Sequence, residues 1–310
     1  MATLNQGSLR LFRFAGIDVF LHWSWFLVAA YMVSQRSHLY SAIQWNVLEY
    51  LALFGIVLLH EFGHALACRQ VGGRSDRIML WPLGGVAYVN PPQRPGATLW
   101  SIAAGPLVNV ILAPALLALS LLMRSLELAD AWPNAHTLLR TVTILNFVLL
   151  IFNLLPIYPL DGGQILRSLL WFLLGRAHSL LVASIIGFLG VGVMILAAVF
   201  LQSIWFGILA GFVLLNCWQG LRQALALARV DKMPHRTGFA CPTCGAAPLI
   251  GAYWRCGQCR TQFDTFETGT VCPHCGAGFD MTRCPDCGAQ HPMNTWRTRP
   301  PIPGNYHPIS

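Results

Sequence analysis

Long runs of apolar residues dominate the first 230 positions of the chain. A helix needs about 20 residues to cross roughly 30 Å of hydrocarbon, at about 1.5 Å per residue. Six runs approach or exceed this length, and we predict helical spans over residues 16–34, 45–68, 96–123, 136–157, 178–201 and 204–228. The first run is followed by further spans, so we interpret it as a retained span rather than a cleaved signal peptide.

The pattern changes after the last apolar run. We therefore divide the chain into a six-span membrane domain (1–235), a cysteine-rich segment (236–290) and a flexible, proline-rich tail (291–310). The predicted fold class is an all-α polytopic membrane protein with a small membrane-associated β-hairpin and a small cytoplasmic double zinc ribbon.

Composition supports a membrane protein. Hydrophobic residues make up 55% of the chain and charged residues 10%, whereas soluble domains carry about 25% charge. Basic residues that flank spans are retained on the cytoplasmic side. With the N-terminus inside, the inner segments hold twelve such residues and the outer segments three. We expect a plasma (inner) membrane protein with both termini in the cytoplasm.

The second span ends in a His-Glu-x-x-His motif, His60-Glu61-Phe62-Gly63-His64. Residues four apart share a helix face, so both imidazoles can bind one Zn²⁺ while Glu61 reaches a water beside it. A simpler interpretation of the motif is that the two histidines are buried polar residues that only hydrogen-bond within a helix bundle. Ionisable groups inside hydrocarbon are costly and rarely idle, which favours metal binding.

A catalytic zinc ion needs a third protein ligand. Asp161 is the candidate, because it follows a stretch rich in proline and glycine at the inner end of the fourth span. Such irregular backbone is tolerated at membrane depth only where it lines a cavity or is buried in protein. An Asp-Gly pair is also common in simple turns. Since spans two and four both run inward, His60, His64 and Asp161 are expected near one leaflet.

Three further residues are left with open roles. Gly105 and Asn109 share a face of the third span, at the same depth as the motif. Gly105 is read as a packing residue, and Asn109 as a hydrogen-bonding partner of a neighbouring helix or of the site. His22 in the first span either assists the site or only hydrogen-bonds to another span.

The motifs HEFGHALA, PLGGVA, GPLVN and NLLPIYPLDGG resemble those of the site-2 protease family of intramembrane zinc metalloproteases. The resemblance covers roughly residues 10–230 and is strongest to the six-span branch of the sporulation-factor processing protease. It implies hydrolysis of a peptide bond in or beside a substrate's transmembrane helix, as in regulated intramembrane proteolysis. Glu61 would be the general base and then the proton carrier to the leaving amine. Asn153 would hold the unwound substrate or the developing oxyanion, or would instead satisfy the kinked backbone nearby.

A helical substrate must unwind before it is cut, and its freed backbone groups then need partners. Residues 78–89 predict a hairpin whose turn region contains Leu83, Gly84 and Gly85, and we assign these three residues to substrate binding by strand addition. A re-entrant plug with no substrate role is the alternative.

Four Cys-x-x-Cys knuckles follow the membrane domain, and each can place two thiolates on one ion. They are formed by Cys241, Cys244, Cys256, Cys259, Cys272, Cys275, Cys284 and Cys287. We expect adjacent knuckles to pair into two structural zinc sites, so that the chain holds one catalytic and two structural Zn²⁺. A reducing cytoplasm disfavours disulfides. About fifty residues would not make a sufficient core without metal, so zinc is expected to supply folding energy.

Nucleic acid is not expected as a partner. Residues 240–310 hold five Arg against four acidic residues, so they lack the basic stripe that phosphate binding requires. A cytosolic protein partner of the ribbons is expected instead, beside a membrane-anchored protein substrate. The alternative function is a non-proteolytic scaffold or metal sensor that recruits a partner through its ribbons. A prenyl-protein protease, in which a glutamate is the third metal ligand, is disfavoured. The candidate glutamates, Glu49 and Glu127, map to the side of the membrane opposite the His-Glu-x-x-His motif.

Overall fold

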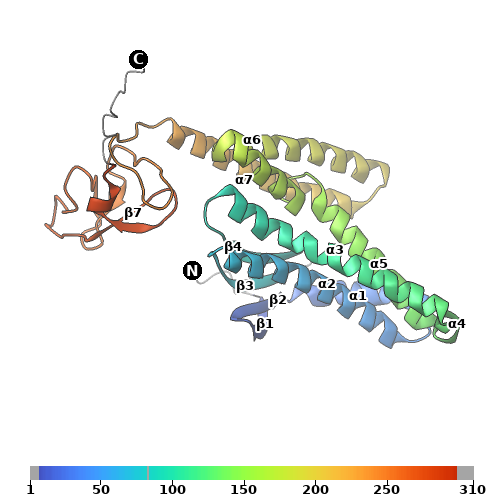
Figure 1. The fold of residues 1–310 in the computed structure, drawn as a ribbon. Coiled ribbons are helices and arrows are strands. Elements are labelled where there is room, and N and C mark those ends of the chain that lie inside the picture. Colours follow the sequence, from blue (N-terminus) through green and yellow to red (C-terminus); the bar gives the residue numbers. More distant parts are fainter. Residues whose placement is uncertain (1–6, 82–83, 299–310) are drawn as a thin grey trace, which may run out of the picture. The chain divides into compact units, whose positions relative to one another are not determined.

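The computed structural model describes residues 7–81 and 84–298 of the chain. The backbone separates into two compact units, residues 1–227 and 228–310 (Figure 1). Each unit has its own core and secondary structure, and the candidate chemistry predicted from the sequence falls into both.

Four of the described helices are long and apolar enough to cross a membrane. They are α2 (Ile43–Gln70), α3 (Pro95–Ser125), α5 (Pro133–Leu154) and α6 (Asp161–Phe200). The first three match predicted spans to within three residues at either end. The helix α6 is two helices joined at Gly175, whose φ of 75° and ψ of 175° interrupt the helical backbone. Its second part, from 176, covers the predicted fifth span (178–201) except for the last residue.

Shorter helices complete the membrane unit. They are α1 (Ser24–Gln35), a 3₁₀ turn at Ser37–Leu39 and α4 (Leu128–Ala131). The long helix α7 (Ile204–Asp231) covers the predicted sixth span and leads into the second unit. Six spans are thus not established by the described helices. At 12 residues, α1 is only about 18 Å long, which is short of the roughly 30 Å hydrocarbon core.

The predicted first span is wrong in its opening residues. Ile17–His22 forms strand β2, which pairs antiparallel with β1 (Ser8–Phe14) and parallel with β3 (Arg74–Trp81). The physical reason is a period of two: Ile17, Val19 and Leu21 are buried while the residues between them are less so. A hydropathy window merges this strand with the apolar helix that follows.

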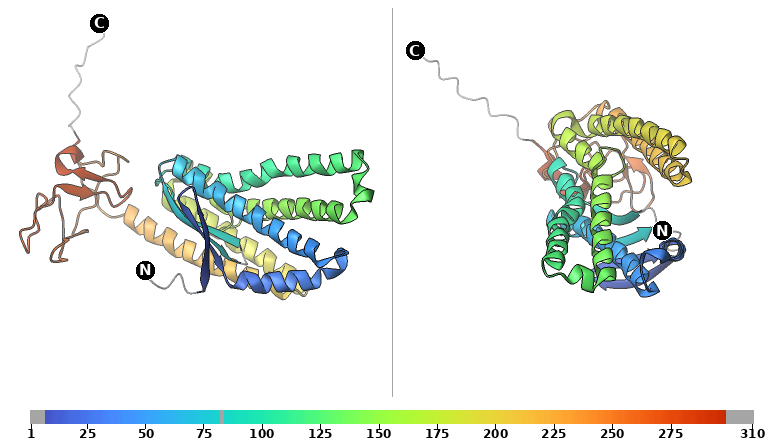
Figure 2. Two further views of the ribbon diagram at one scale, coloured as in Figure 1. Left: turned by 90° about the horizontal axis from the view of Figure 1, so that it is seen from below. Right: turned by 90° about the vertical axis from the view of Figure 1, so that its right-hand side faces the viewer.

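The predicted hairpin is confirmed and belongs to a larger sheet. β3 pairs antiparallel with β4 (Gly84–Asn90), and the sheet order is β1-β2-β3-β4. The buried side chains of β2 and β3 pack against α2 in one core that includes Val57 and Ala65. Figure 2 shows the strands of this sheet beside the ribbon of α2. Strand β4 lies at the edge of the sheet and also contacts α2. Pro82 and Leu83, in the turn, lie outside the described residues.

The helices α2 and α3 lie side by side and approach closely (Figure 1). A methyl group at Gly63 would lie 2.6 Å from the carbonyl oxygen of Ala104, so only glycine fits on this face of α2. Small residues allow membrane helices to pack at short distance. This packing brings the His-Glu-x-x-His motif against α3.

The second unit holds two small hairpins. β5 (Trp254–Arg255) pairs with β6 (Gln262–Phe263), and β7 (Met281–Arg283) pairs with β8 (Gln290–Pro292), which precedes a 3₁₀ turn at Met293–Trp296. The side chain of Arg236 is hydrogen-bonded to Asp264 at 2.5 Å and to Glu267 at 3.1 Å. These bonds hold the start of the unit to its middle.

Candidate metal centres and active site

His60, His64 and Asp161 lie together as predicted, and their ligand atoms are within 4.8 Å of one another. His60 Nε2 lies 3.0 Å and His64 Nε2 3.4 Å from Asp161 Oδ2, and the two Nε2 atoms are 3.1 Å apart. Ligand atoms about 2.0–2.1 Å from a tetrahedral Zn²⁺ lie roughly 3.3 Å from each other. The three residues therefore fit one zinc ion.

The carboxylate is positioned by the irregular stretch between α5 and α6. Asp161 is the first residue of α6, and the turn before it contains a cis Tyr158–Pro159 bond. A methyl group at Gly162 would lie 2.3 Å from the carbonyl oxygen of Leu154, and one at Gly163 would lie 2.4 Å from the amide nitrogen of Tyr158. The two glycines thus let the first turn of α6 pack onto the preceding backbone.

The other ring nitrogen of each histidine is held by α3. His60 Nδ1 is 2.7 Å from Asn109 Oδ1, and His64 Nδ1 is 3.0 Å from the carbonyl oxygen of Ser101. Bonds of this kind fix the orientation of a ligating imidazole. The open role of Asn109 is thereby resolved, since it contacts both the site and a neighbouring helix through Asn146 on α5.

Glu61 is buried between α2 and the edge strand. Its Oε2 accepts a hydrogen bond of 2.8 Å from the amide of Ala87 on β4. A methyl group at Gly85 would lie 2.3 Å from Glu61 Cγ, so the glycine makes room for the carboxylate. Nothing in the sequence pattern indicated the contribution of Ala87, because it comes from the backbone.

A cavity of about 750 Å³ reaches these residues. It is lined by the three candidate ligands and Glu61, and by Asn153 and Gly85, both predicted to bind substrate. Gln164 on α6 and Asn216 on α7 also line it and were missed. Their only sequence signal is polarity within apolar helices.

His22 does not line the cavity. Its ring stacks on Trp81 with centroids 4.1 Å apart, and its Nδ1 is 2.5 Å from Ser24 Oγ. Trp81 and Ser24 do line the cavity, so His22 supports the wall rather than the centre. Glu49 is likewise elsewhere, in an ion pair of 2.9 Å with Arg36.

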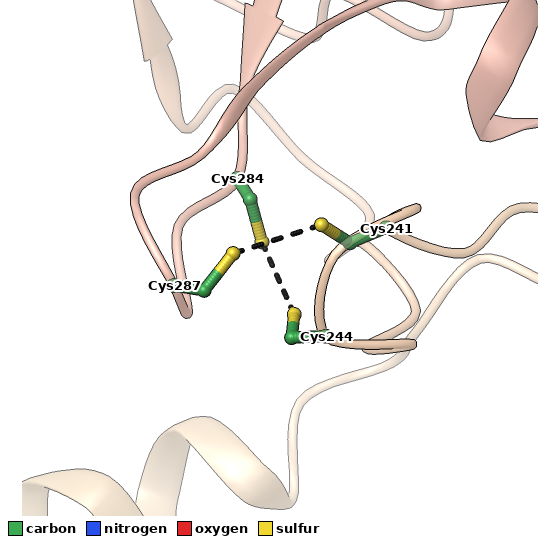
Figure 3. Close-up of side chains that lie close together, drawn as sticks. All are labelled: Cys241, Cys244, Cys284 and Cys287. Atoms are coloured by element: carbon green, nitrogen blue, oxygen red, sulfur yellow. Dashed lines mark hydrogen bonds between the residues drawn. The ribbon is translucent and has the colours of Figure 1, made fainter. Parts of the chain in front are cut away.

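The eight knuckle cysteines form two clusters in the second unit, but not in the predicted pairing. One cluster joins the first and fourth knuckles, Cys241, Cys244, Cys284 and Cys287 (Figure 3), and the other joins the second and third, Cys256, Cys259, Cys272 and Cys275. The expectation that neighbouring knuckles pair one with two and three with four is wrong. The chain between Cys244 and Cys284 folds out and back, so the knuckles nest.

The sulfur separations suit zinc. In the first cluster, the sulfurs of Cys241 and Cys287 are 3.7 Å apart and those of Cys244 and Cys284 are 3.8 Å apart. In the second cluster, the sulfurs of Cys256 and Cys275 are 3.6 Å apart, as are those of Cys259 and Cys272. Sulfurs about 2.3 Å from a tetrahedral Zn²⁺ lie roughly 3.8 Å apart. Hydrogen bonds with Thr261 lower the pKa of Cys259 to about 5, which favours its thiolate, whereas burial raises the pKa of Cys244 to about 11.

Comparison with known proteins matches the part of the chain that holds this site. The model of peptidase family M50 matches residues 49–135 and 129–197, a stretch that contains His60, Glu61, His64 and Asp161. The solved structure of a site-2 protease from Methanocaldococcus jannaschii is similar, with a TM-score of 0.50, 31% identity, and coverage of 69% of this chain and 95% of that one.

Curated relatives match over the same part of the chain. Zinc metalloprotease MJ0392 of Methanocaldococcus jannaschii is 37% identical over 180 residues, which are 58% of this chain and 50% of that protein. Stage IV sporulation protein FB of Bacillus subtilis is 37% identical over 120 residues, 37% of this chain and 38% of that protein. The chain spans at most about half the length of these curated relatives.

Proposed function

The chain belongs to the site-2 protease family, peptidase family M50, and from this premise we propose that it is an intramembrane zinc metalloprotease. Its reaction is hydrolysis of a peptide bond in or near the transmembrane segment of a membrane protein. The observation that carries the proposal is the meeting of His60, His64 and Asp161, from α2 and α6, at separations that fit one zinc ion.

Zinc held by His60 Nε2, His64 Nε2 and Asp161 Oδ2 would supply a Lewis acid that polarises the scissile carbonyl and lowers the pKa of water to about 7. Glu61 then acts as general base. Its Oε2 is held by Ala87, and its carboxylate lines the cavity, where it takes a proton from water and passes it to the leaving nitrogen. The hydrogen bond to Ala87 fixes the carboxylate at the reacting atoms.

The substrate binds as an added strand on β4. Gly85, Ala87 and Val89, which alternate along β4, all line the cavity. Since the Ala87 amide points away from β3 to Glu61, the N–H groups of its neighbours at i ± 2 point the same way. An extended substrate segment can therefore hydrogen-bond to this edge beside the metal centre. Asn153, which also lines the cavity, donates to the unwound substrate backbone.

The topology is part of the proposal. Six spans with both termini in the cytoplasm place the ribbon cysteines on the reducing side of the membrane, where thiolates stay free to bind Zn²⁺. The ribbons then hold two structural ions, in addition to the catalytic one, and dock a cytosolic protein.

The test is proteolysis by the purified, full-length protein in detergent or vesicles, with a helical transmembrane substrate. Cleavage is expected, and Glu61→Gln is expected to reduce it by about 10²–10⁴-fold while zinc content stays the same. The Gln side chain keeps an acceptor for the Ala87 amide, so the variant changes the base and little else. Undiminished cleavage by Glu61→Gln contradicts the mechanism, and absence of cleavage in both forms favours the scaffold.

A further inference from the structure

Two asparagines connect His60 to a helix that contributes no metal ligand. Asn109 on α3 and Asn146 on α5 are both 0% exposed. Asn109 Nδ2 donates to Asn146 Oδ1 at 2.8 Å, and Asn146 Nδ2 donates to the main-chain carbonyl of Asn109 at 3.0 Å. Asn109 Oδ1 in turn lies 2.7 Å from His60 Nδ1. The chain of contacts therefore runs from α5 through α3 to α2.

The direction of every bond in this chain follows from its last member. A main-chain carbonyl can only accept, so the Asn146 side chain must turn its NH₂ group toward it and its oxygen toward Asn109. Asn109 must then present its NH₂ group to Asn146 and its oxygen to His60. The Asn109 oxygen accepts a hydrogen bond from Nδ1 only when Nδ1 carries a proton, and Nε2 is then the ring nitrogen that faces Asp161 and the metal position.

We propose that Asn146 is a positioning residue that fixes the side-chain amide of Asn109, so that the Asn109 oxygen accepts from His60 Nδ1–H and His60 presents Nε2 to the metal. This inference rests on the proposed role of His60 as a ligand. Without Asn146, nothing in the described network fixes the Asn109 amide. The amide is then free to rotate and turn its NH₂ group toward Nδ1–H, which removes the acceptor that orients the ring.

His64 provides an internal comparison. Its Nδ1 lies 3.0 Å from the carbonyl oxygen of Ser101, so its Nδ1–H is held by the backbone and does not depend on a side-chain amide. A specific role of Asn146 therefore changes one of the two rings. A general loosening of the helix bundle changes both.

The experiment uses the full-length, zinc-loaded protein in detergent, with ¹⁵N-labelled histidine. Asn146→Leu keeps the branched shape of the side chain and removes both hydrogen bonds. Asn146→Ala is the second variant, in case Leu disturbs folding. Thr143→Val is the matched control, since Thr143 is buried one turn earlier on α5 and its hydroxyl bonds only to the carbonyl of Leu139, at 2.7 Å.

The signal of each ring's Nδ1–H reports its hydrogen bond through its chemical shift and its rate of exchange with water. We expect the Asn146 variants to shift the His60 Nδ1–H signal and speed its exchange, to leave His64 unchanged and to release the zinc ion held by His60, His64 and Asp161 to a chelator roughly 10–100-fold more readily. The ribbon zinc of the same chain serves as the reference for chelation. Adding Asn109→Asp to Asn146→Leu should restore the original His60 signal. A carboxylate can only accept a hydrogen bond, so it presents an oxygen to His60 Nδ1 in any rotation.

The proposal is overturned by an unchanged His60 ring in both Asn146 variants, by equal changes in His60 and His64, or by no rescue with Asn109→Asp. None of them bears on whether the protein is a protease, which the Glu61→Gln comparison decides separately. The same shifts in Thr143→Val would assign the effect to packing of α5 and also overturn the proposal.

Discussion

The imidazole of His64 lies directly against the α-carbon of Gly105, on the neighbouring helix α3. A methyl group added at Gly105 would be 2.2 Å from His64 Nε2, the atom that faces the metal site. The glycine thus leaves the space that the His64 ring occupies. Its small size affects both the packing of α2 against α3 and the position of His64 at the metal site.

Gly105→Ala is expected to displace His64 and so to weaken zinc binding at the bilayer site by roughly 10–100-fold, with a matching loss of proteolysis. Zinc content per chain, after dialysis against a chelator, measures the effect. Gly55→Ala on α2 is the control, since a methyl group there meets nothing within 4 Å. Equal zinc content in Gly105→Ala and Gly55→Ala would show that the ring can move aside.

Gly85→Ala is expected to affect the base instead of the metal. The added methyl group would lie 2.3 Å from Glu61 Cγ and must push the carboxylate away. A displacement of about 1 Å can lower kcat by roughly 10²-fold, while zinc content stays unchanged. In the control Gly96→Ala, the nearest atom, Phe172 Cζ, is 3.8 Å away. If zinc is lost together with kcat, the assignment of Gly85 to Glu61 alone is incorrect.

Val89→Pro tests strand addition. Its N–H points away from β3 by strand alternation, so proline removes a hydrogen bond to the substrate without removing one from the sheet. We expect KM to rise by up to about tenfold, from a loss of roughly 0.5–1.5 kcal/mol, with kcat and zinc content unchanged. Val89→Ala, which keeps the N–H, should behave like the unchanged protein. Equal KM values for the two variants would favour the alternative that this hairpin is a re-entrant plug with no role in substrate binding.

The nested pairing of the knuckles is testable by counting zinc. Cys244→Ser and Cys284→Ser each remove a ligand of the same cluster, so the double variant should lose no more zinc than either single variant. Cys244→Ser combined with Cys259→Ser should lose two ions, because these residues belong to different clusters. Pairing of neighbouring knuckles predicts the reverse pattern.

The meeting of His60, His64 and Asp161 could be predicted because each residue carries a local signal. His60 and His64 are one helical turn apart, and Asp161 follows a stretch of proline and glycine that no membrane helix tolerates without a cavity. Span direction then placed the three residues near one leaflet. The structure adds the distances, which periodicity alone does not give.

The parts that could not be predicted depend on contacts without a local pattern. Asn146 is one polar residue in an apolar span, and its partner Asn109 is 37 residues away. The Ala87 amide has no side-chain signature. For the cysteines, spacing defines each knuckle but not which pair shares an ion, since that depends on how the intervening chain folds.

The nested ribbons imply an order of metal uptake. The inner cluster closes the 14 residues from Cys259 to Cys272, and the outer cluster closes the 41 residues from Cys244 to Cys284. Bringing the ends of the shorter segment together costs about 1 kcal/mol less in chain entropy. When metal is scarce, the inner cluster binds its ion first. This shortens the flexible segment between the two knuckles of the outer cluster, so the outer ion binds to a chain that is already partly ordered.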